Sequence, residues 1–324
     1  MDASGPLLET VVQAVRASTG WTSKAGIGIV GEVLGRPDWR HGPGDDAAVV
    51  GSGDESLVVC GEAILPEFVE HDPYGAGIAA VLANVNDVAA MGAIPLAIVD
   101  TLVADHATSA AVLEGMRAAS RLYDVPIVGG HLTPREDRPA LSAFALGRCP
   151  GPALSATNLR PGQRVGLLGC IEGRMRDDFP FFPSFDERGE LLAGDVRLLA
   201  ELACDGCCSG AKDVSMAGIL GSLAMLLEPT GCGVTVDLAA IPVPADVELI
   251  RWLVCFPCLM FLVTGPPEAE ARTAAAAAGR GLIYATLGTL DGNGVLGLRH
   301  EGRTVTLIDL RTEGITRLAP LARE

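Results

Sequence analysis

The clearest amphipathic pattern of the chain lies between residues 72 and 95. Asp72 is a preferred N-cap residue and Pro73 suits the first helical position, so the sequence predicts a helix that begins at residue 73. This helix should end near Met91, because Gly92 is a common helix terminator and Pro95 cannot continue a helix. One face is apolar at helical spacing and carries Ile78, Val81, Leu82, Val85, Val88 and Ala89.

The opposite face of this helix is also unusually poor in charge. It carries Ala80, Ala83, Asn84, Asp87 and Ala90, where a solvent-facing helix would carry Lys and Glu. We therefore expect another element or subunit to cover it. A carboxylate on a covered face is costly unless it is paired or binds a cation. Asp87 is thus a candidate cation ligand, and hydrogen bonding to local backbone groups is the alternative.

Strands and helices alternate along the rest of the chain, and several strands follow one another directly. In the first half, the pattern predicts a helix around Leu7 to Val15, a helix over 107–122, and strands over 47–50, 57–60, 96–101, 125–129 and 141–148. In the second half, it predicts strands over 164–170, 234–237 and 259–264, and helices over 195–204, 215–227, 247–254 and 268–278. This order predicts an α+β fold with mixed sheets. The turn-rich stretch 149–152 predicts a boundary between domains 1–152 and 153–324.

The composition of the chain limits which binding partners it can have and indicates its cellular compartment. The formal net charge of −16 argues against a nucleic acid or an anionic membrane as partner, because both need a basic surface. No apolar run approaches the roughly 20 residues of a membrane span, and no signal-peptide pattern opens the sequence. Nine cysteines without small-scaffold spacing fit free thiols in a reducing compartment. We therefore expect a cytoplasmic protein.

Four more carboxylates occur at the ends of predicted elements. Asp45 and Asp46 precede a strand, Glu62 follows one, and Asp213 precedes a helix. Carboxylates are hard oxygen ligands, suited to holding Mg²⁺ against the phosphates of a nucleotide. Turn formation by Asp45 and Asp46 and helix capping by Asp213 are the local alternatives. Together with Asp87, these positions favour a shared metal site.

Two other patterns carry candidate chemistry. Gly129 and Gly130 permit close backbone approach to a ligand, and His131 after them is a candidate phosphate contact or acid–base group; a structural histidine is the alternative. The pairs Cys204/Cys207 and Cys255/Cys258 have zinc-site spacing, but they lie in apolar segments, so small buried residues are the favoured interpretation. The sequence contains no P-loop, Rossmann fingerprint or nucleophile elbow.

These motifs, in this order, resemble the superfamily of aminoimidazole ribonucleotide (AIR) synthetase, thiamine-monophosphate kinase, selenophosphate synthetase and the hydrogenase maturation carbamoyl dehydratase. The resemblance covers roughly residues 40–290. It is carried by Gly44-Asp45-Asp46-Ala47-Ala48, Asn86-Asp87, Met91-Gly92-Ala93-Ile94-Pro95, Gly129-Gly130-His131 and Lys212-Asp213-Val214-Ser215.

The resemblance implies a two-domain α+β fold. Its N-terminal mixed sheet with helices would pair with that of a second subunit in a homodimer, and its C-terminal domain would be an α/β sandwich. It also implies ATP bound through Mg²⁺. Asp45, Asp46, Asp87 and Asp213 match family ligand positions, and Glu62 stands where an Asp is more usual. By the same resemblance, the residues implied to contact the nucleotide are Asp45, Asp46, Asn84, Asn86, Gly129, Gly130 and Lys212, and those implied to serve catalysis are Asp87 and His131.

The individual enzymes of this superfamily fit less well. Selenophosphate synthetase has a reactive Cys or selenocysteine near its N-terminus, whereas the first Cys here is Cys60, and the carbamoyl dehydratase has a C-terminal Cys that is not seen here. Thiamine-monophosphate kinase would show Asp where this chain has His131. AIR synthetase shares the Asn-Asp helix and an acidic residue like Asp100, but its glycine-rich, Lys-bearing N-terminal loop is missing. The chain most resembles AIR synthase-related proteins.

The sequence thus predicts an ATP- and Mg²⁺-dependent enzyme that acts on a small molecule. It would be a kinase, or a ligase that activates an oxygen by phosphorylating it. The alternative is a non-catalytic nucleotide-binding or assembly subunit with the same fold.

Overall fold

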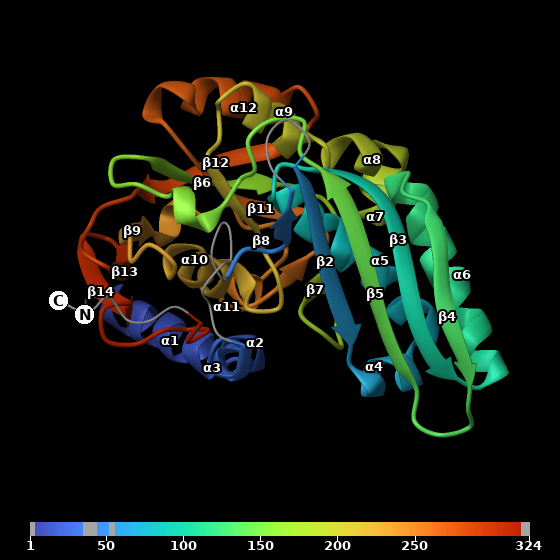
Figure 1. Cartoon of the computed structure of the whole chain (residues 1–324). Coiled ribbons are helices and arrows are strands. Elements are labelled where there is room, and N and C mark those ends of the chain that lie inside the picture. Colours follow the sequence, from blue (N-terminus) through green and yellow to red (C-terminus); the bar gives the residue numbers. More distant parts are fainter. Residues whose placement is uncertain (1–3, 35–43, 52–55, 319–324) are drawn as a thin grey trace. The chain divides into compact units, whose positions relative to one another are not determined.

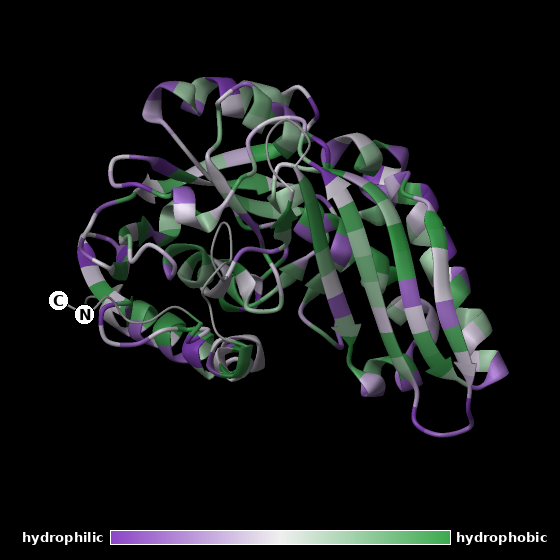
Figure 2. Cartoon of the chain, viewed as in Figure 1, coloured by the Kyte–Doolittle hydropathy of each residue, from purple (hydrophilic) through white to green (hydrophobic). Residues whose placement is uncertain are grey.

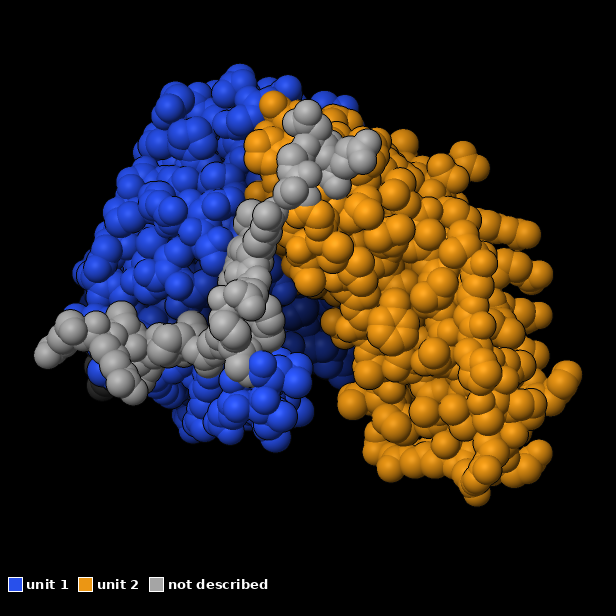
Figure 3. Space-filling view, in the orientation of Figure 1, with its two compact units in different colours: residues 1–45, 154–187, 205–324 blue, residues 46–153, 188–204 orange. Residues whose placement is uncertain are grey.

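The computed structural model describes residues 4–34, 44–51 and 56–318. Their contacts divide the chain into two compact units (Figure 3): unit 1 comprises residues 1–45, 154–187 and 205–324, and unit 2 comprises residues 46–153 and 188–204. The predicted division was instead a single boundary after residue 152. The two divisions differ because the N-terminal segment packs in unit 1 and the segment 188–204 packs in unit 2.

Unit 2 is built on a five-stranded mixed sheet (Figure 1). In spatial order its strands are β1 (Ala48–Val50), β2 (Leu57–Ile64), β5 (Ala140–Arg148), β3 (Ile94–Ala104) and β4 (Ile127–Pro134). The first four are antiparallel to their neighbours, and β3 pairs with β4 in parallel. The α+β class with mixed sheets is therefore confirmed.

The helices of unit 2 pack on one face of this sheet. The two long ones, α5 (Pro73–Ala90) and α6 (His106–Tyr123), lie side by side against it (Figure 1). The shorter ones are α4 (Pro66–His71), α8 (Leu192–Asp195) and α9 (Leu198–Cys204). The predicted helix after Asp72 is confirmed: the Asp72 carboxylate accepts the Gly75 N–H at 2.9 Å, and Gly92 follows the helix with φ of 66°. Local capping residues thus fix both ends of α5.

Helix α5 is buried on both faces, as its composition predicted. Its first two turns cross the middle of α6 at two glycines: a Cβ at Gly77 would lie 2.1 Å from the Val112 carbonyl oxygen, and one at Gly115 would lie 2.0 Å from that of Tyr74. Any side chain at these positions would separate the helices. This close crossing leaves the face that carries Asn84 and Asp87 turned toward β2 and β5.

The other face of the sheet is apolar and is not covered by any helix among the described residues of unit 2. Side chains alternate between the two faces of a strand, and this face carries the half-exposed residues Val50, Val59, Val99 and Phe144. Figure 2 shows how strongly apolar these strands are. An uncovered apolar sheet of this kind marks an interaction surface.

Unit 1 contains two larger sheets around one hydrophobic core. One has the order β12 (Ile283–Thr289), β6 (Arg164–Gly169), β11 (Met260–Gly265), β8 (Gly210–Asp213), and the other the order β14 (Arg303–Asp309), β13 (Val295–His300), β9 (Val234–Asp237). A short parallel pair joins β7 (Phe181–Phe182) to β10 (Phe256–Pro257). The α-helices are α1 (Ser4–Ala17), α2 (Thr19–Thr22), α3 (Gly28–Leu34), α7 (Phe185–Arg188, at the junction with unit 2), α10 (Gly218–Leu227), α11 (Leu249–Leu253) and α12 (Glu270–Ala278). Trp252 is fully buried in the core, in an edge-to-face contact with Phe182.

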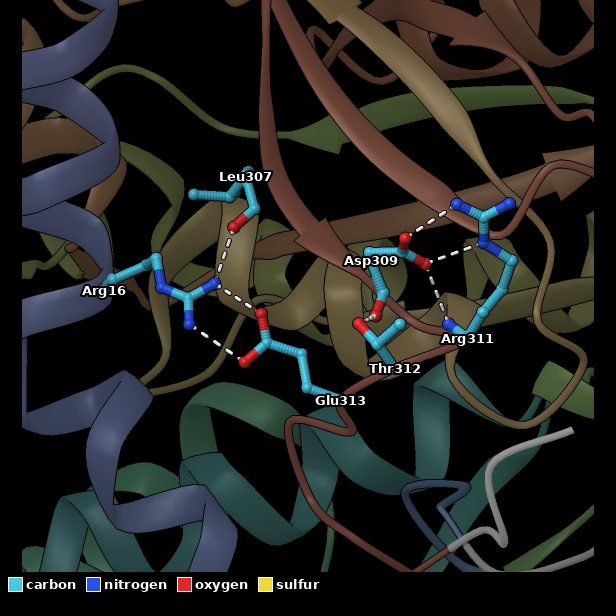
Figure 4. Close-up of polar contacts among 6 residues, drawn as sticks. All are labelled: Arg16, Leu307, Asp309, Arg311, Thr312 and Glu313. Atoms are coloured by element: carbon cyan, nitrogen blue, oxygen red, sulfur yellow. Dashed lines mark hydrogen bonds and ion pairs between the residues drawn. The ribbon is translucent and has the colours of Figure 1, made fainter.

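The N-terminal helix belongs to unit 1 because α1 packs on its second sheet and is tied to its end (Figure 4). Leu8, Val11 and Val15 of α1 are fully buried in the core. The Arg16 guanidinium donates two hydrogen bonds to the Glu313 carboxylate, at 2.8 and 2.9 Å, and one to the Leu307 carbonyl oxygen at 2.8 Å. These contacts between residues far apart in the sequence place α1 in unit 1, and the predicted domain boundary stays a prediction. None of the described helices combines the length and hydropathy that a bilayer crossing requires.

Candidate functional site

Three of the predicted carboxylates converge within unit 2, around a thiol that sequence reasoning did not single out. Cys60 lies on β2 and faces α5, where its Sγ is 3.3 Å from Asn84 Oδ1 and 3.5 Å from the Asn84 carbonyl oxygen. Burial raises the pKa of this thiol far above its usual range, and the charges of Asp87, Glu62 and Asp46 raise it further. A carboxylate oxygen of Asp46 and one of Asp87 lie within 4.8 Å of each other.

The elements explain this convergence. Asp46 lies in the turn before β1, which pairs with β2, and Glu62 lies on β2 two residues beyond Cys60, on the same face. Asp87 is in the last turn of α5 and is 7% exposed. A helix C-terminus carries partial negative charge, so it disfavours a buried carboxylate. A divalent cation would relieve both this repulsion and that between Asp46 and Asp87.

Asp45 has a different role from its neighbour. Its carboxylate accepts hydrogen bonds from the Ser155 hydroxyl and from the Ala156 N–H, both at 2.6 Å, within unit 1. Burial raises the pKa of Asp45 to about 6, against the lowering effects of these two bonds and of the Lys212 charge. These hydrogen bonds fix Asp45 to the backbone at Ala156, and metal and nucleotide binding by Asp45 stay predictions.

Asp213 and Lys212 form a buried ion pair in unit 1. They lie at the end of β8, are 3% and 5% exposed, and the Lys212 ammonium is 3.2 Å from an Asp213 carboxylate oxygen. The alternative that Asp213 caps the following helix is wrong, because α10 begins only at Gly218 and Ala217 is its N-cap. Metal binding by Asp213 and nucleotide binding by Lys212 stay predictions.

The two asparagines of α5 are completely buried. The Asn84 amide donates to the carbonyl oxygens of Ala80, at 2.8 Å, and Ala143, at 3.2 Å, so it ties α5 to β5. This structural role differs from the predicted contact of Asn84 with a nucleotide. For Asn86 that contact stays a prediction.

Gly129, Gly130 and His131 lie within β4 and not, as predicted, at the end of a strand, because β4 continues to Pro134. His131 pairs with Thr101 and therefore projects from the sheet face that the helices leave uncovered, whereas Glu62 and Cys60 project from the covered face. The structure thus does not bring His131 to the carboxylates. A catalytic role of His131 stays a prediction, as does nucleotide contact by the two glycines.

Three cysteines of the two pairs, Cys207, Cys255 and Cys258, are buried as predicted, whereas Cys204 is exposed. Cys255 and Cys258 are fully buried, and Cys258 Sγ accepts the Ser184 N–H at 3.1 Å. Burial raises the pKa of Cys258 to about 12, which disfavours a thiolate ligand. No set of three mutually close metal-binding side chains in the described ranges includes a cysteine.

Comparison with known proteins gives the family of this chain. The sequence matches AIR synthase related protein, N-terminal domain, over residues 44–149, and AIR synthase related protein, C-terminal domain, over residues 177–301. The chain belongs to this AIR synthase-related family, and the predicted resemblance is confirmed.

Relatives and solved structures support the same assignment. The chain is 33% identical to the uncharacterized protein sll0787 of Synechocystis sp., over 84% of this chain and 85% of that protein. It is 28% identical to the phosphoribosylformylglycinamidine synthase subunit PurL of Natronomonas pharaonis, over 74% of this chain and 36% of that one. T. maritima PurL complexed with ATP superimposes with a TM-score of 0.70 at 22% identity, over 86% of this chain and 47% of that chain. The chain thus spans less than half the length of these PurL proteins, and the structural match establishes a shared AIR synthetase-like fold.

Proposed function

We propose that this protein is an ATP- and Mg²⁺-dependent enzyme that transfers a phosphoryl group in a reaction on a small molecule. The observation that carries the proposal is the close approach of Asp46 and Asp87, with Glu62 beside the same thiol. Plain scaffolding does not explain such a concentration of like charge, whereas a divalent cation does. A solved structure of the same fold holds ATP.

In this proposal the acidic residues bind the metal ion and a basic residue contacts the nucleotide. Asp46, Glu62 and Asp87 would hold Mg²⁺, and the cation would neutralise the triphosphate and the charge that develops during transfer. Lys212 and Asp213 are assigned to the nucleotide and the metal from the sequence alone. Catalysis of this kind depends mainly on positioning and electrostatics, so it needs no dedicated nucleophile on the protein.

The reaction is proposed as that of a kinase, or of a ligase that activates an oxygen of its substrate. The two differ in their products: a kinase releases ADP and keeps the phosphate on the acceptor, whereas a ligase releases both ADP and inorganic phosphate. Assays of both products with candidate acceptors distinguish these reactions. PurL relatives, named as synthase subunits, make the ligase reaction the first to test.

The decisive experiment is a thermal-unfolding titration with ATP, with and without Mg²⁺, on the unmodified chain and on Asp87→Asn. Ligand at about 100 times its Kd adds roughly 2.7 kcal/mol to the free energy of unfolding, which raises Tm by about 4 °C for a protein of this size. We expect this Mg²⁺-dependent rise for the unmodified chain and its loss in Asp87→Asn. Asp137→Asn, which removes an exposed carboxylate of unit 2, is the matched control and should keep the rise.

Two results would count against the proposal. Absence of any rise at millimolar Mg-ATP would refute nucleotide binding, and an undiminished rise in Asp87→Asn would refute the assigned metal site. A normal rise without release of ADP across an acceptor panel would favour the non-catalytic nucleotide-binding subunit.

We also propose a homodimer and a cytoplasmic location. The uncovered face of the unit 2 sheet supports the dimer, because four half-exposed apolar side chains, Val50, Val59, Val99 and Phe144, share it. All nine cysteines are free thiols, which fits a reducing compartment that also supplies ATP.

A further inference from the structure

Two cysteines of unit 2 lie outside the proposed metal site, each close to a point where the chain passes to unit 1. Cys149 directly follows β5 and is 2% exposed. Cys204 is the last residue of α9, and of the nine cysteines, all of which the structure describes, it alone is exposed. The chain leaves unit 2 after residue 153 and again after residue 204. Both thiols therefore lie at connections between the units.

The segment that carries Cys149 is in direct contact with Cys204. A Cβ at Gly151, two residues beyond Cys149, would lie 3.0 Å from Cys204 Sγ and 3.1 Å from Cys204 Cα. Burial raises the pKa of the Cys149 thiol to about 11, and the charge of Cys204 adds to this rise, as a nearby ionisable group does. The two thiols are thus neighbours, although more than 50 positions separate them in the sequence.

The surroundings hold Cys149 in place and leave Cys204 freer to move. The Cys149 N–H donates to the Ser56 carbonyl oxygen at 2.9 Å, and its Sγ donates to that of Met91, the C-cap of α5, at 3.8 Å. Helix α9 also packs against α5. A disulfide needs Cα atoms no more than about 7 Å apart, and the terminal residue of a helix can adjust to reach this distance. A bond between the two thiols would join the ends of β5, α5 and α9.

We propose that Cys149 and Cys204 form a peroxide-responsive modification site, at which a reversible disulfide fixes the segment 188–204 to the end of β5. The exposed thiol is the one that an oxidant can reach, and the buried thiol beside it is the resolving partner. In a reducing compartment such a bond is transient, as in redox sensors. This inference does not rest on the proposed function, because it involves neither nucleotide nor metal.

The oxidation balances with hydrogen peroxide as the oxidant. The Cys204 sulfur attacks one peroxide oxygen and the O–O bond breaks, which leaves a sulfenic acid on Cys204 and releases one water. The Cys149 sulfur then displaces the hydroxyl group of this sulfenic acid, so the S–S bond forms and a second water leaves with the Cys149 proton. The two thiols together lose two electrons, and the peroxide gains them. A dithiol reductant reverses the reaction by thiol–disulfide exchange.

The test treats the full chain with hydrogen peroxide, blocks the remaining thiols with iodoacetamide and maps disulfides by mass spectrometry without reduction. Trypsin isolates Cys149 in the fragment 149–164, and additional cleavage before Asp205 isolates Cys204 in the fragment 198–204. We expect the two fragments to be joined after peroxide treatment and separate after dithiothreitol. Oxidation should also raise Tm by about 3–6 °C, because the bond constrains the unfolded chain.

Two variants make the test specific. Cys204→Ser alters an exposed side chain, so it should fold, and it should lose both the joined fragments and the rise in Tm. Cys232→Ala, which removes a buried thiol of unit 1, is the matched control and should keep both. A bond from Cys204 to Cys207, or fragments that stay separate after peroxide treatment, would overturn the proposal. An equal rise in Tm in Cys204→Ser would overturn it as well.

Discussion

Unit 2 buries charged side chains in two different arrangements: an ion pair of opposite charges, and two carboxylates placed close together. Arg188 and Asp195 form an ion pair with two hydrogen bonds, at 2.8 and 2.9 Å, and their side chains are 5% and 2% exposed. This pair cancels its own charge. Asp46 and Asp87 instead bring like charges together, so they need a cation from outside the chain. The contrast distinguishes a structural pair from a functional one.

The Arg188–Asp195 pair is predicted to stabilise the fold of the segment 188–204, in which both residues lie. Asp195→Asn removes one charge of a buried pair and leaves the guanidinium uncompensated, so we expect a loss of about 3–5 kcal/mol in the free energy of unfolding. Urea unfolding at pH 7 measures this loss. The double variant Arg188→Met/Asp195→Leu buries no charge and should be less destabilised than the single variant. A loss below 1 kcal/mol in Asp195→Asn would show that the pair is not closed in solution.

The sequence predicted which carboxylates are special more reliably than it predicted which residues each of them contacts. The sequence identified Asp45 and Asp46 together, but neighbouring residues in a turn point in different directions, and only Asp46 reaches Asp87. Asp45 instead accepts hydrogen bonds from Ser155 and Ala156, which lie more than 100 positions away in the sequence. Cys60 was missed because a small residue in a strand gives no sign of the charges around it. The only indication in the sequence was that Cys60 lies two positions before Glu62 in a predicted strand, so that both side chains project to the same face.

At the scale of elements, the crossing of α5 and α6 depends on two glycines. We predict that Gly77→Ala and Gly115→Ala each lower the free energy of unfolding by about 1–3 kcal/mol, because the added Cβ would overlap backbone of the opposite helix. Gly194→Ala in α8 is the control: its Cβ would meet nothing within 4 Å, and alanine should stabilise this helix by roughly 0.5–1 kcal/mol. Thermal and urea unfolding compare the three variants. Equal effects at all three positions would mean that helix propensity, not the crossing, sets the result.

The contact of α1 with the end of β14 predicts a pH-dependent stability. The Arg16 guanidinium lowers the pKa of Glu313 through their hydrogen bonds. A lowered folded-state pKa means that the contribution is present above the unfolded-state pKa of about 4.3 and is lost as pH falls through the folded-state value. Both side chains are partly exposed, so a double-mutant cycle of Arg16→Gln and Glu313→Gln should give about 0.5 kcal/mol of coupling at pH 7.

The same cycle should give steadily less coupling as the pH falls through the lowered folded-state pKa of Glu313. The exposed pair Asp309–Arg311, also shown in Figure 4, is the control, because it joins residues only two positions apart and ties no distant elements. Arg311→Gln should therefore leave unfolding unchanged. Coupling between Arg16 and Glu313 that did not decrease as the pH was lowered would contradict the assigned charge contribution.

Elements with strong local signals were predicted well, and those set by distant contacts were not. Helix α5 carries its own cap, periodicity and terminating glycine, so its bounds followed from the sequence. Strand β4 was cut short at Gly129 and Gly130, since paired glycines usually mark a turn, whereas here Gly130 lies within a strand against Asp100. The predicted helix 195–204 begins later, at Leu198, as α9; Asp195 instead ends the separate short helix α8, which lies against α6.

At the scale of the whole molecule, the two units have different surfaces. Unit 1 encloses a core with helices and two larger sheets, whereas unit 2 leaves one face of its sheet apolar. On that face, the Phe144 ring lies over Gly61, where a Cβ would be 2.4 Å from a ring carbon, and Val99 pairs with Phe144 from β3. A second copy of this chain offers the same apolar surface, so a symmetric pairing would bury both sheets.

This pairing leads to the prediction that a charge at the centre of the uncovered face prevents dimerisation. Phe144 is 41% exposed and central to the patch, so Phe144→Lys should convert a dimer into a monomer by placing two like charges across the symmetry axis. Leu113→Lys is the control: Leu113 is 40% exposed on α6, on the opposite side of the sheet, and should leave the dimer intact. Sedimentation equilibrium measures both masses. A monomeric unmodified chain would refute the homodimer, and a dimer that survives Phe144→Lys would place its interface elsewhere. If Phe144→Lys also abolished the Mg²⁺-dependent response to ATP while remaining folded, the sheet pairing would be needed for nucleotide binding as well as for assembly.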